Sequence, residues 1–85
     1  MIPTRTKETI DLYVSRGCEP GGFMYAVLTN DLFGAIARAD VENRMNLQAI
    51  CQYIYNDIRS DCWGSKEKVQ SWMKQKRAER EIGNG

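Results

Sequence analysis

Residues 21–43 contain the groups of this sequence that are best placed for binding chemistry. Gly21 and Gly22 stand at the predicted start of a helix, where backbone N–H groups lack helical partners and the helix dipole attracts an anion. Tyr25 and Arg38 follow, and they can supply a stacking face and a contact to phosphate. One interpretation of this pattern is a site that binds an anionic group. The alternative is that the two glycines only make a tight turn and allow helices to pack closely.

The candidate ligand site combines this helix start with the polar side chains that follow it. Its members are Gly21, Gly22, Phe23, Tyr25, Asn30, Asp31, Arg38, Asp40 and Asn43. The polar members have a second interpretation, because Asn and Asp side chains also cap short helices and can pair with a neighbouring Arg. The sequence leaves both interpretations open, one with a ligand and one purely structural.

The composition argues against catalysis and against a metal centre. The 85 residues include no histidine, so neither a Ser–His nor a Cys–His nucleophile pair can form. Cys18, Cys51 and Cys62 contain no C-x-x-C pair and would need carboxylates at irregular spacing to hold zinc. We therefore expect a protein that is not an enzyme and that uses no cofactor and no metal.

The charge distribution leaves nucleic acid as an alternative partner. The formal net charge is only +1, but the last twenty-one residues are basic. They hold Lys66, Lys68, Lys74, Lys76, Arg77 and Arg80 against Glu67, Glu79 and Glu81. A basic helix of this kind can contact phosphates, and binding would then weaken steeply with salt. The interleaved acidic residues favour the other interpretation, a solvated helix surface.

Helical spacing of apolar residues predicts an all-α fold, a compact bundle of four to five short helices. The longest is expected around residues 40–58, with Asp40 as its N-cap and an apolar stripe on one face. The stripe consists of Leu47, Ile50, Cys51, Ile54, Tyr55 and Ile58. Gly17 is expected to end a first helix over residues 4–16, and Ser65 to cap the last one.

The chain is predicted to form one helical domain over residues 1–73, followed by a polar, partly frayed tail over residues 74–85. Apolar side chains off the main stripes, such as Leu12, Phe33 and Met45, exceed what one small core can use. Such an excess favours a homo-oligomer. No apolar run reaches the length of a signal peptide or a membrane span, so we expect no membrane partner and a cytoplasmic location.

The segments GGFMYAVLTNDLFGAIARADVEN, ICQYIYNDI and CWGSKEKVQSWM resemble a family of small proteins encoded by tailed bacteriophages and prophages. The pattern of that family runs G-G-F, A-V-L-x-N-D-L, R-A-D-x-x-N, Y-N and G-S. Its matching positions here are Gly21, Gly22, Phe23, Asn30, Asp31, Leu32, Arg38, Ala39, Asp40, Asn43, Tyr55, Asn56, Gly64 and Ser65. The resemblance covers roughly residues 8–73 and leaves the basic tail outside.

The resemblance implies a phage-derived protein that acts in the cytoplasm of an infected bacterium. It implies no assigned enzymatic activity. The resulting hypothesis is a non-enzymatic accessory protein that counters host defence by binding and sequestering its target. That target is either a host protein or a small anionic signalling nucleotide. A small nucleic-acid-binding regulator that uses the basic C-terminal helix is the alternative.

Overall fold

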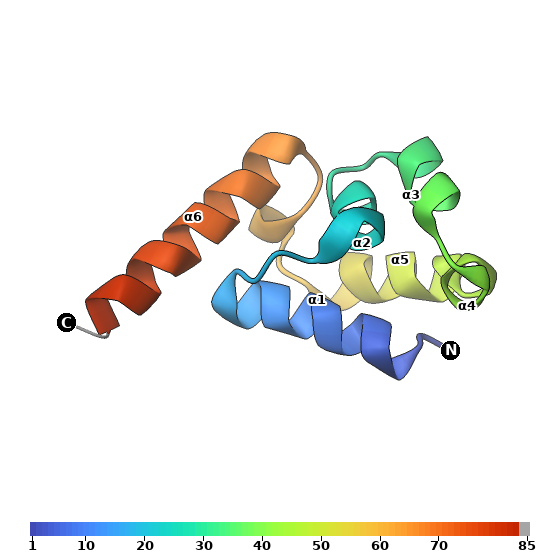
Figure 1. The fold of residues 1–85 in the computed structure, drawn as a ribbon, viewed down its shortest axis with the longest axis horizontal. Helices are drawn as coiled ribbons and strands as arrows, with labels where there is room; N and C mark the ends of the chain where they lie inside the picture. The colour runs from blue at the N-terminus through green and yellow to red at the C-terminus, as the bar shows by residue number, and fades with distance from the viewer. Residues whose placement is uncertain (84–85) are drawn as a thin grey trace.

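The computed structural model of the protein describes residues 1–83, and these residues form helices joined by short connections, with no strand among them (Figure 1). The predicted all-α fold is confirmed. In chain order the elements are α1 (Thr4–Arg16), α2 (Gly21–Leu28), α3 (Leu32–Arg38), α4 (Val41–Met45), α5 (Leu47–Asp57), the short 3-10 helix η1 (Ser60–Cys62) and α6 (Lys66–Gly83). Residues 1–83 contain six α-helices, whereas four to five were expected.

The extra helix arises because the single helix expected around residues 40–58 is interrupted at Asn46. The Asn46 side-chain amide donates a hydrogen bond to the Glu42 carbonyl oxygen at 2.8 Å. Its backbone N–H donates to the same oxygen at 3.2 Å. A side chain that binds a helix carbonyl competes with the regular backbone pattern, which is why Asn is weak inside helices. The chain therefore ends α4 at Met45 and begins α5 at Leu47.

Local signals set most of the other helix ends. Gly17 follows α1 with φ of 70°, and its N–H donates to the Tyr13 carbonyl oxygen at 2.8 Å, as expected for a left-handed helix end. Asp40 caps α4 by accepting from the Asn43 N–H at 2.8 Å. Ser65 caps α6 by accepting from the Lys68 N–H at 3.2 Å. These three predicted ends are confirmed.

The core lies where α1, α2, α5 and α6 meet. Its buried side chains are Ile10, Tyr13, Met24, Leu28, Ile50, Ile54, Cys62, Val69 and Trp72. Tyr13 has no exposed surface, and its hydroxyl donates to the Cys62 carbonyl oxygen at 2.7 Å. The Trp72 indole N–H donates to the Tyr13 and Val14 carbonyl oxygens at the end of α1. These bonds fix the start of α6 against the rest of the domain.

The apolar stripe expected along residues 40–58 is only partly buried. Ile50 and Ile54 lie in the core, whereas Cys51 is exposed and Tyr55 is 75% exposed. A stripe this wide cannot face one core completely, since α5 contacts its neighbours over a narrower arc. Cys51 and Tyr55 instead line a surface groove, described below.

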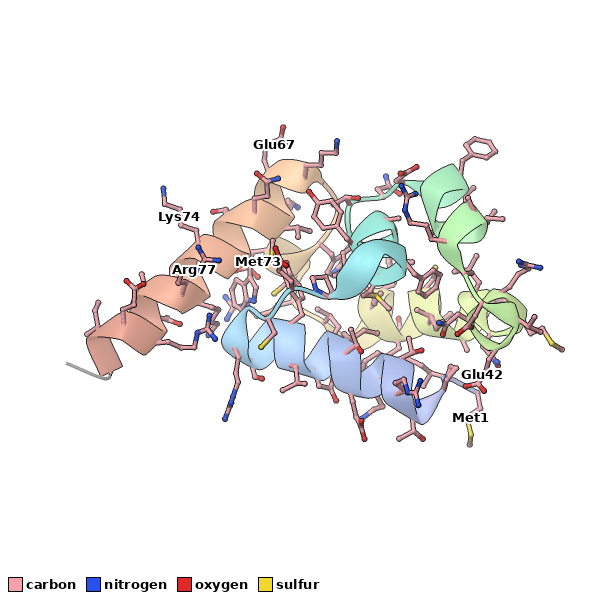
Figure 2. The ribbon with its side chains drawn as sticks, in the orientation of Figure 1. Met1, Glu42, Glu67, Met73, Lys74 and Arg77 are labelled. Carbon is pink, nitrogen blue, oxygen red and sulfur yellow. The ribbon has the colours of Figure 1, made fainter. Side chains whose placement is uncertain are left out.

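The last turns of α6 extend past the rest of the domain, at the end of the molecule opposite α3 and α4 (Figure 1). Lys74 and Arg77 point away from the domain (Figure 2). Lys76 differs, because its ammonium lies 4.8 Å from the centre of the Trp72 ring and pairs with Glu79 at 3.2 Å. Of the segment predicted as a polar, partly frayed tail, residues 74–83 belong to α6, and residues 84–85 lie outside the described residues.

Candidate functional site

The start of α2 leaves its first backbone N–H groups without a side-chain cap. Pro20 occupies the N-cap position, and its side chain offers no hydrogen-bond acceptor. Gly21 has φ of 83°, and nothing lies within 4 Å of the position that a Cβ would take. An uncapped helix start of this kind can bind an anion. No side chain caps the helix start at which the glycine pair was predicted to expose backbone donors.

A hollow of about 210 Å³ borders this helix start. It is lined by Arg5, Thr6, Thr9, Pro20, Gly21, Gly22, Phe23, Met24 and Asn43. Four of the nine candidate residues, Gly21, Gly22, Phe23 and Asn43, meet here. Thr6 is 8% exposed, and its hydroxyl donates to the Asn43 side-chain oxygen. That bond joins α1 to α4. It also occupies the Asn43 side-chain oxygen, which a ligand could otherwise use as a hydrogen-bond acceptor.

Arg38 packs across the beginning of α2 on another side. A Cβ added to Gly22 would stand 3.2 Å from Arg38 Cδ, so the absence of a side chain at Gly22 makes room for the arginine. The Arg38 guanidinium donates to the Gly34 carbonyl oxygen at 3.3 Å. Asp31 lies close by, because its carboxylate accepts from the Gly34 N–H at 3.0 Å and caps α3. A Cβ on Gly34 would overlap that carboxylate.

The other candidate residues point elsewhere. Tyr25 faces α6, where its hydroxyl accepts from the Gln70 amide at 3.2 Å beside a second hollow of about 350 Å³ that also touches Gly21 and Gly22. Asp40 is occupied as the cap of α4. Asn30 has φ of 66° and lies at the turn between α2 and α3. The nine candidate residues thus lie in α2 and in the segments that follow it, and they do not converge on one cavity.

A cavity with a volume of about 470 Å³ lies between α2 and α5. It is lined by Val27, Asn30, Gln48, Cys51, Gln52, Ile54, Tyr55, Asn56 and Trp63. We call these nine residues the α2–α5 groove. Every lining side chain is uncharged, and apolar groups alternate with amides. Such a surface suits a partner that offers apolar side chains and backbone hydrogen-bonding groups.

Three of the four groove amides come from one face of α5, and the fourth, Asn30, lies between α2 and α3. Gln48, Gln52 and Asn56 are spaced four residues apart and therefore line up along the helix. The sequence analysis did not select Gln48 or Gln52, although this spacing was available to find them. Tyr55 and Asn56, two positions that carry the phage-family resemblance, lie in the groove as well.

The aromatic wall of the groove is held in place by α5 and the loop after it. The Tyr55 and Trp63 rings lie 6.0 Å apart between centres and are tilted by 51°. The Trp63 indole N–H donates to the Ile58 carbonyl oxygen at 3.1 Å. Loss of solvation raises the pKa of the Cys51 thiol, so the groove holds a neutral thiol at neutral pH. The groove therefore offers stacking faces and neutral donors and acceptors.

A smaller hollow of about 70 Å³ continues the groove toward α3, since it shares Val27, Asn30 and Cys51. Leu32 and Asp31 close its far end. Across residues 1–83, no group of three Cys, Asp or Glu side chains is arranged to hold a metal ion. In the same span, no helix is long and apolar enough to cross a membrane.

The fold and its cavities define a small all-α protein with an uncharged groove on one side and an uncapped helix start on another. The chain matches no protein-family profile, no curated protein and no solved structure. The likeness to the phage-encoded family therefore stays a prediction from the residues quoted above.

Proposed function

We propose that this protein is a non-enzymatic accessory protein of a tailed bacteriophage or prophage. It acts in the cytoplasm of the infected bacterium, as a homo-oligomer, and counters host defence by binding and sequestering a host protein. The observation that carries the choice of a protein target is the uncharged α2–α5 groove, with its volume of about 470 Å³. A phosphate-bearing ligand would need charged donors there, and the groove lining has none.

The groove suits a protein segment in two respects. Val27, Tyr55 and Trp63 offer apolar area that an aliphatic or aromatic anchor can cover. Gln48 and Gln52 can exchange hydrogen bonds with the backbone of the same segment, so its polar groups are not left unpaired on burial. We expect the bound segment to be short, with one or two large apolar side chains.

The test compares a groove variant with a matched control outside the groove. Tyr55→Glu places a charge at a groove side chain that is 75% exposed, whereas Ile82→Glu places one at a 79% exposed side chain on α6. Neither change affects a buried residue, so both variants should fold. Tagged protein is expressed in a bacterium that carries a defence system, and both phage plating and co-purified host proteins are measured.

We expect the native protein and Ile82→Glu to raise plating and to co-purify the same host protein in comparable amounts. Tyr55→Glu should do neither. If Tyr55→Glu keeps both effects, the groove is not the binding site. If the native protein changes plating in no defence background and retains no host protein, the proposed function is wrong.

A small anionic nucleotide is the second candidate target. It is favoured by the uncapped start of α2 beside Arg5 and Arg38. Calorimetry with a panel of cyclic nucleotides tests it, and Arg38→Ala should abolish any binding that is found. Binding that Arg38→Ala leaves intact would place the nucleotide elsewhere, and no heat across the panel would remove this candidate.

A nucleic-acid-binding regulator has weaker support. Two of the six basic residues near the C-terminus serve the protein itself, because Lys68 donates to the Ser60 carbonyl oxygen and Lys76 stacks on Trp72. This alternative predicts binding to DNA or RNA that weakens steeply with salt and disappears on truncation after Met73. Absence of binding at low salt would exclude it.

A further inference from the structure

One end of the molecule exposes large apolar side chains that neither the core nor the groove uses. They belong to α3 and α4 and are exposed as follows: Leu32 57%, Phe33 84%, Ile36 41%, Val41 66% and Met45 80%. We call these five side chains the α3–α4 face. Within the same two helices only Ala35 is buried, and α4 buries no residue. The apolar side chains of this segment therefore face solvent in the single chain.

The face lies at one extremity of an elongated molecule. The protein measures 43 × 24 × 21 Å, and α3 and α4 occupy the end opposite the C-terminus (Figure 1). Met1 and Glu42 are found at this end too (Figure 2). The Met1 amine donates to the Asn46 side-chain oxygen at 3.3 Å. This bond holds Met1, another exposed apolar residue, beside α4.

We propose that the α3–α4 face binds the same face of a second copy, which gives a two-fold symmetric dimer. This inference rests on the homo-oligomer in the proposed function. It assigns the surface through which the chains associate, and it sets the number of chains at two. The area supports it. Five large side chains at these exposures offer on the order of 600 Å², and a stable interface buries about 800 Å² per partner, including its polar rim. A patch of that size stands at the upper end of what a typical monomer exposes, and such patches often mark an interaction site.

The charges around the face favour a second copy over a strongly charged partner. Three carboxylates, Asp31, Asp40 and Glu42, lie on the same segment as two guanidinium groups, Arg38 and Arg44. In the part of the chain that the structure describes, none of the five belongs to an ion pair. A two-fold interface can pair a carboxylate of one chain with a guanidinium of the other, and each such pair then occurs twice because the same patch serves both chains. A nucleic acid, in contrast, would meet three carboxylates here.

The experiment measures the mass of the full chain by sedimentation equilibrium in reducing buffer, over concentrations up to the millimolar range. The native protein should reach twice the 9.8 kDa of one chain. Phe33→Glu and Met45→Glu each place a charge within the apolar face, and each should raise the dimer dissociation constant about tenfold or more. Ile82→Glu, at a 79% exposed position on α6, should leave it unchanged.

All three positions are well exposed, so the variants should keep the helix content of the native protein in circular dichroism. A native protein that stays at the mass of one chain overturns the inference, as does a trimer or larger assembly. The inference is also overturned if Ile82→Glu and Phe33→Glu change the dimer dissociation constant equally. The proposed function fails separately, because co-purification of a host protein by the groove is measured with Tyr55→Glu and does not require a dimer.

Discussion

The Tyr13 hydroxyl donates a hydrogen bond to the Cys62 carbonyl oxygen at 2.7 Å, between residues 49 positions apart in the sequence. Tyr13 has no exposed surface, and Cys62 has none either. The bond therefore joins α1 to η1 inside the core and satisfies two polar groups that have no access to water. It holds the connection between α5 and α6 against α1.

Replacing Tyr13 with phenylalanine should destabilise the protein by about 1–3 kcal/mol, because a buried carbonyl loses its donor. In a domain of this size, each kcal/mol corresponds to roughly 4–8 °C in melting temperature. Thermal unfolding followed by circular dichroism measures the change. Tyr55→Phe is the control, since Tyr55 is 75% exposed and should have almost no effect. Equal melting temperatures for both variants would contradict the assigned role of the Tyr13 bond.

Stability should fall at alkaline pH because two tyrosines resist ionisation in the folded protein. A hydrogen bond from Tyr53 to Asp11 at 2.6 Å, together with burial, raises the pKa of Tyr53 to about 12 from a usual value of 10.0. Burial raises the pKa of Tyr13 well above the same value. The unfolded chain ionises first, so this contribution is complete below pH 10.0 and is lost as the pH rises through 12.

Denaturant titrations at increasing pH measure this loss. Tyr53→Phe removes one of the two groups and should make the alkaline decline shallower, whereas Tyr55→Phe should leave it as in the native protein. A decline of the same steepness in Tyr53→Phe would show that the Tyr53–Asp11 bond does not couple ionisation to folding.

Gly17 and Gly21 form a matched pair, with φ of 70° and 83°. Alanine at either position pays the cost of the left-handed conformation, about 1–2 kcal/mol. At Gly17 the added Cβ would also stand 2.6 Å from Lys76 Cβ and 3.3 Å from the Met73 carbonyl oxygen, whereas at Gly21 it meets open space. Gly17→Ala should therefore cost more by roughly 1–3 kcal/mol of packing strain. Chemical denaturation measures both, and equal costs would mean that α6 does not pack on Gly17.

The caps at Asp31 and Asp40 should each contribute about 1 kcal/mol, because each carboxylate accepts a backbone N–H at the start of a helix. Asp31→Ala and Asp40→Ala should lower the free energy of unfolding by this amount and add in the double variant. Asp31→Asn and Asp40→Asn retain an acceptor and should remain near the native value. If the alanine variants are as stable as the native protein, capping is not the role of these residues.

Much of the secondary structure followed from the sequence because the signals are local. Gly17 ends α1, and Asp40 and Ser65 cap α4 and α6, as their residue types predict. A cap or a left-handed residue depends on atoms three or four positions away, so one chain segment carries the whole signal. Asn46 shows the limit of this approach, since its side-chain bond to Glu42 divides a helix that periodicity presents as continuous.

The candidate site was predicted less completely, for a reason that lies in packing. The exposed start of α2 at Gly21 followed from the glycines, and so did the nearby position of Arg38. Tyr25 turned toward Gln70 and α6 instead, because which face of α2 meets α6 depends on contacts between distant segments. Gln48 and Gln52 of the α2–α5 groove were not selected, although their four-residue spacing with Asn56 is visible in the sequence.

The sequence by itself determined that this chain is helical and that it carries neither histidine nor a recognisable metal motif. The tertiary structure decided which apolar side chains are buried. Ile50 and Cys51 are neighbours on one predicted stripe, yet Ile50 is fully buried and Cys51 lines the groove. Periodicity identifies side chains that are able to leave water, whereas burial requires a neighbouring element to cover them. Other core side chains cover Ile50, whereas Cys51 and the α3–α4 face stay exposed in the single chain.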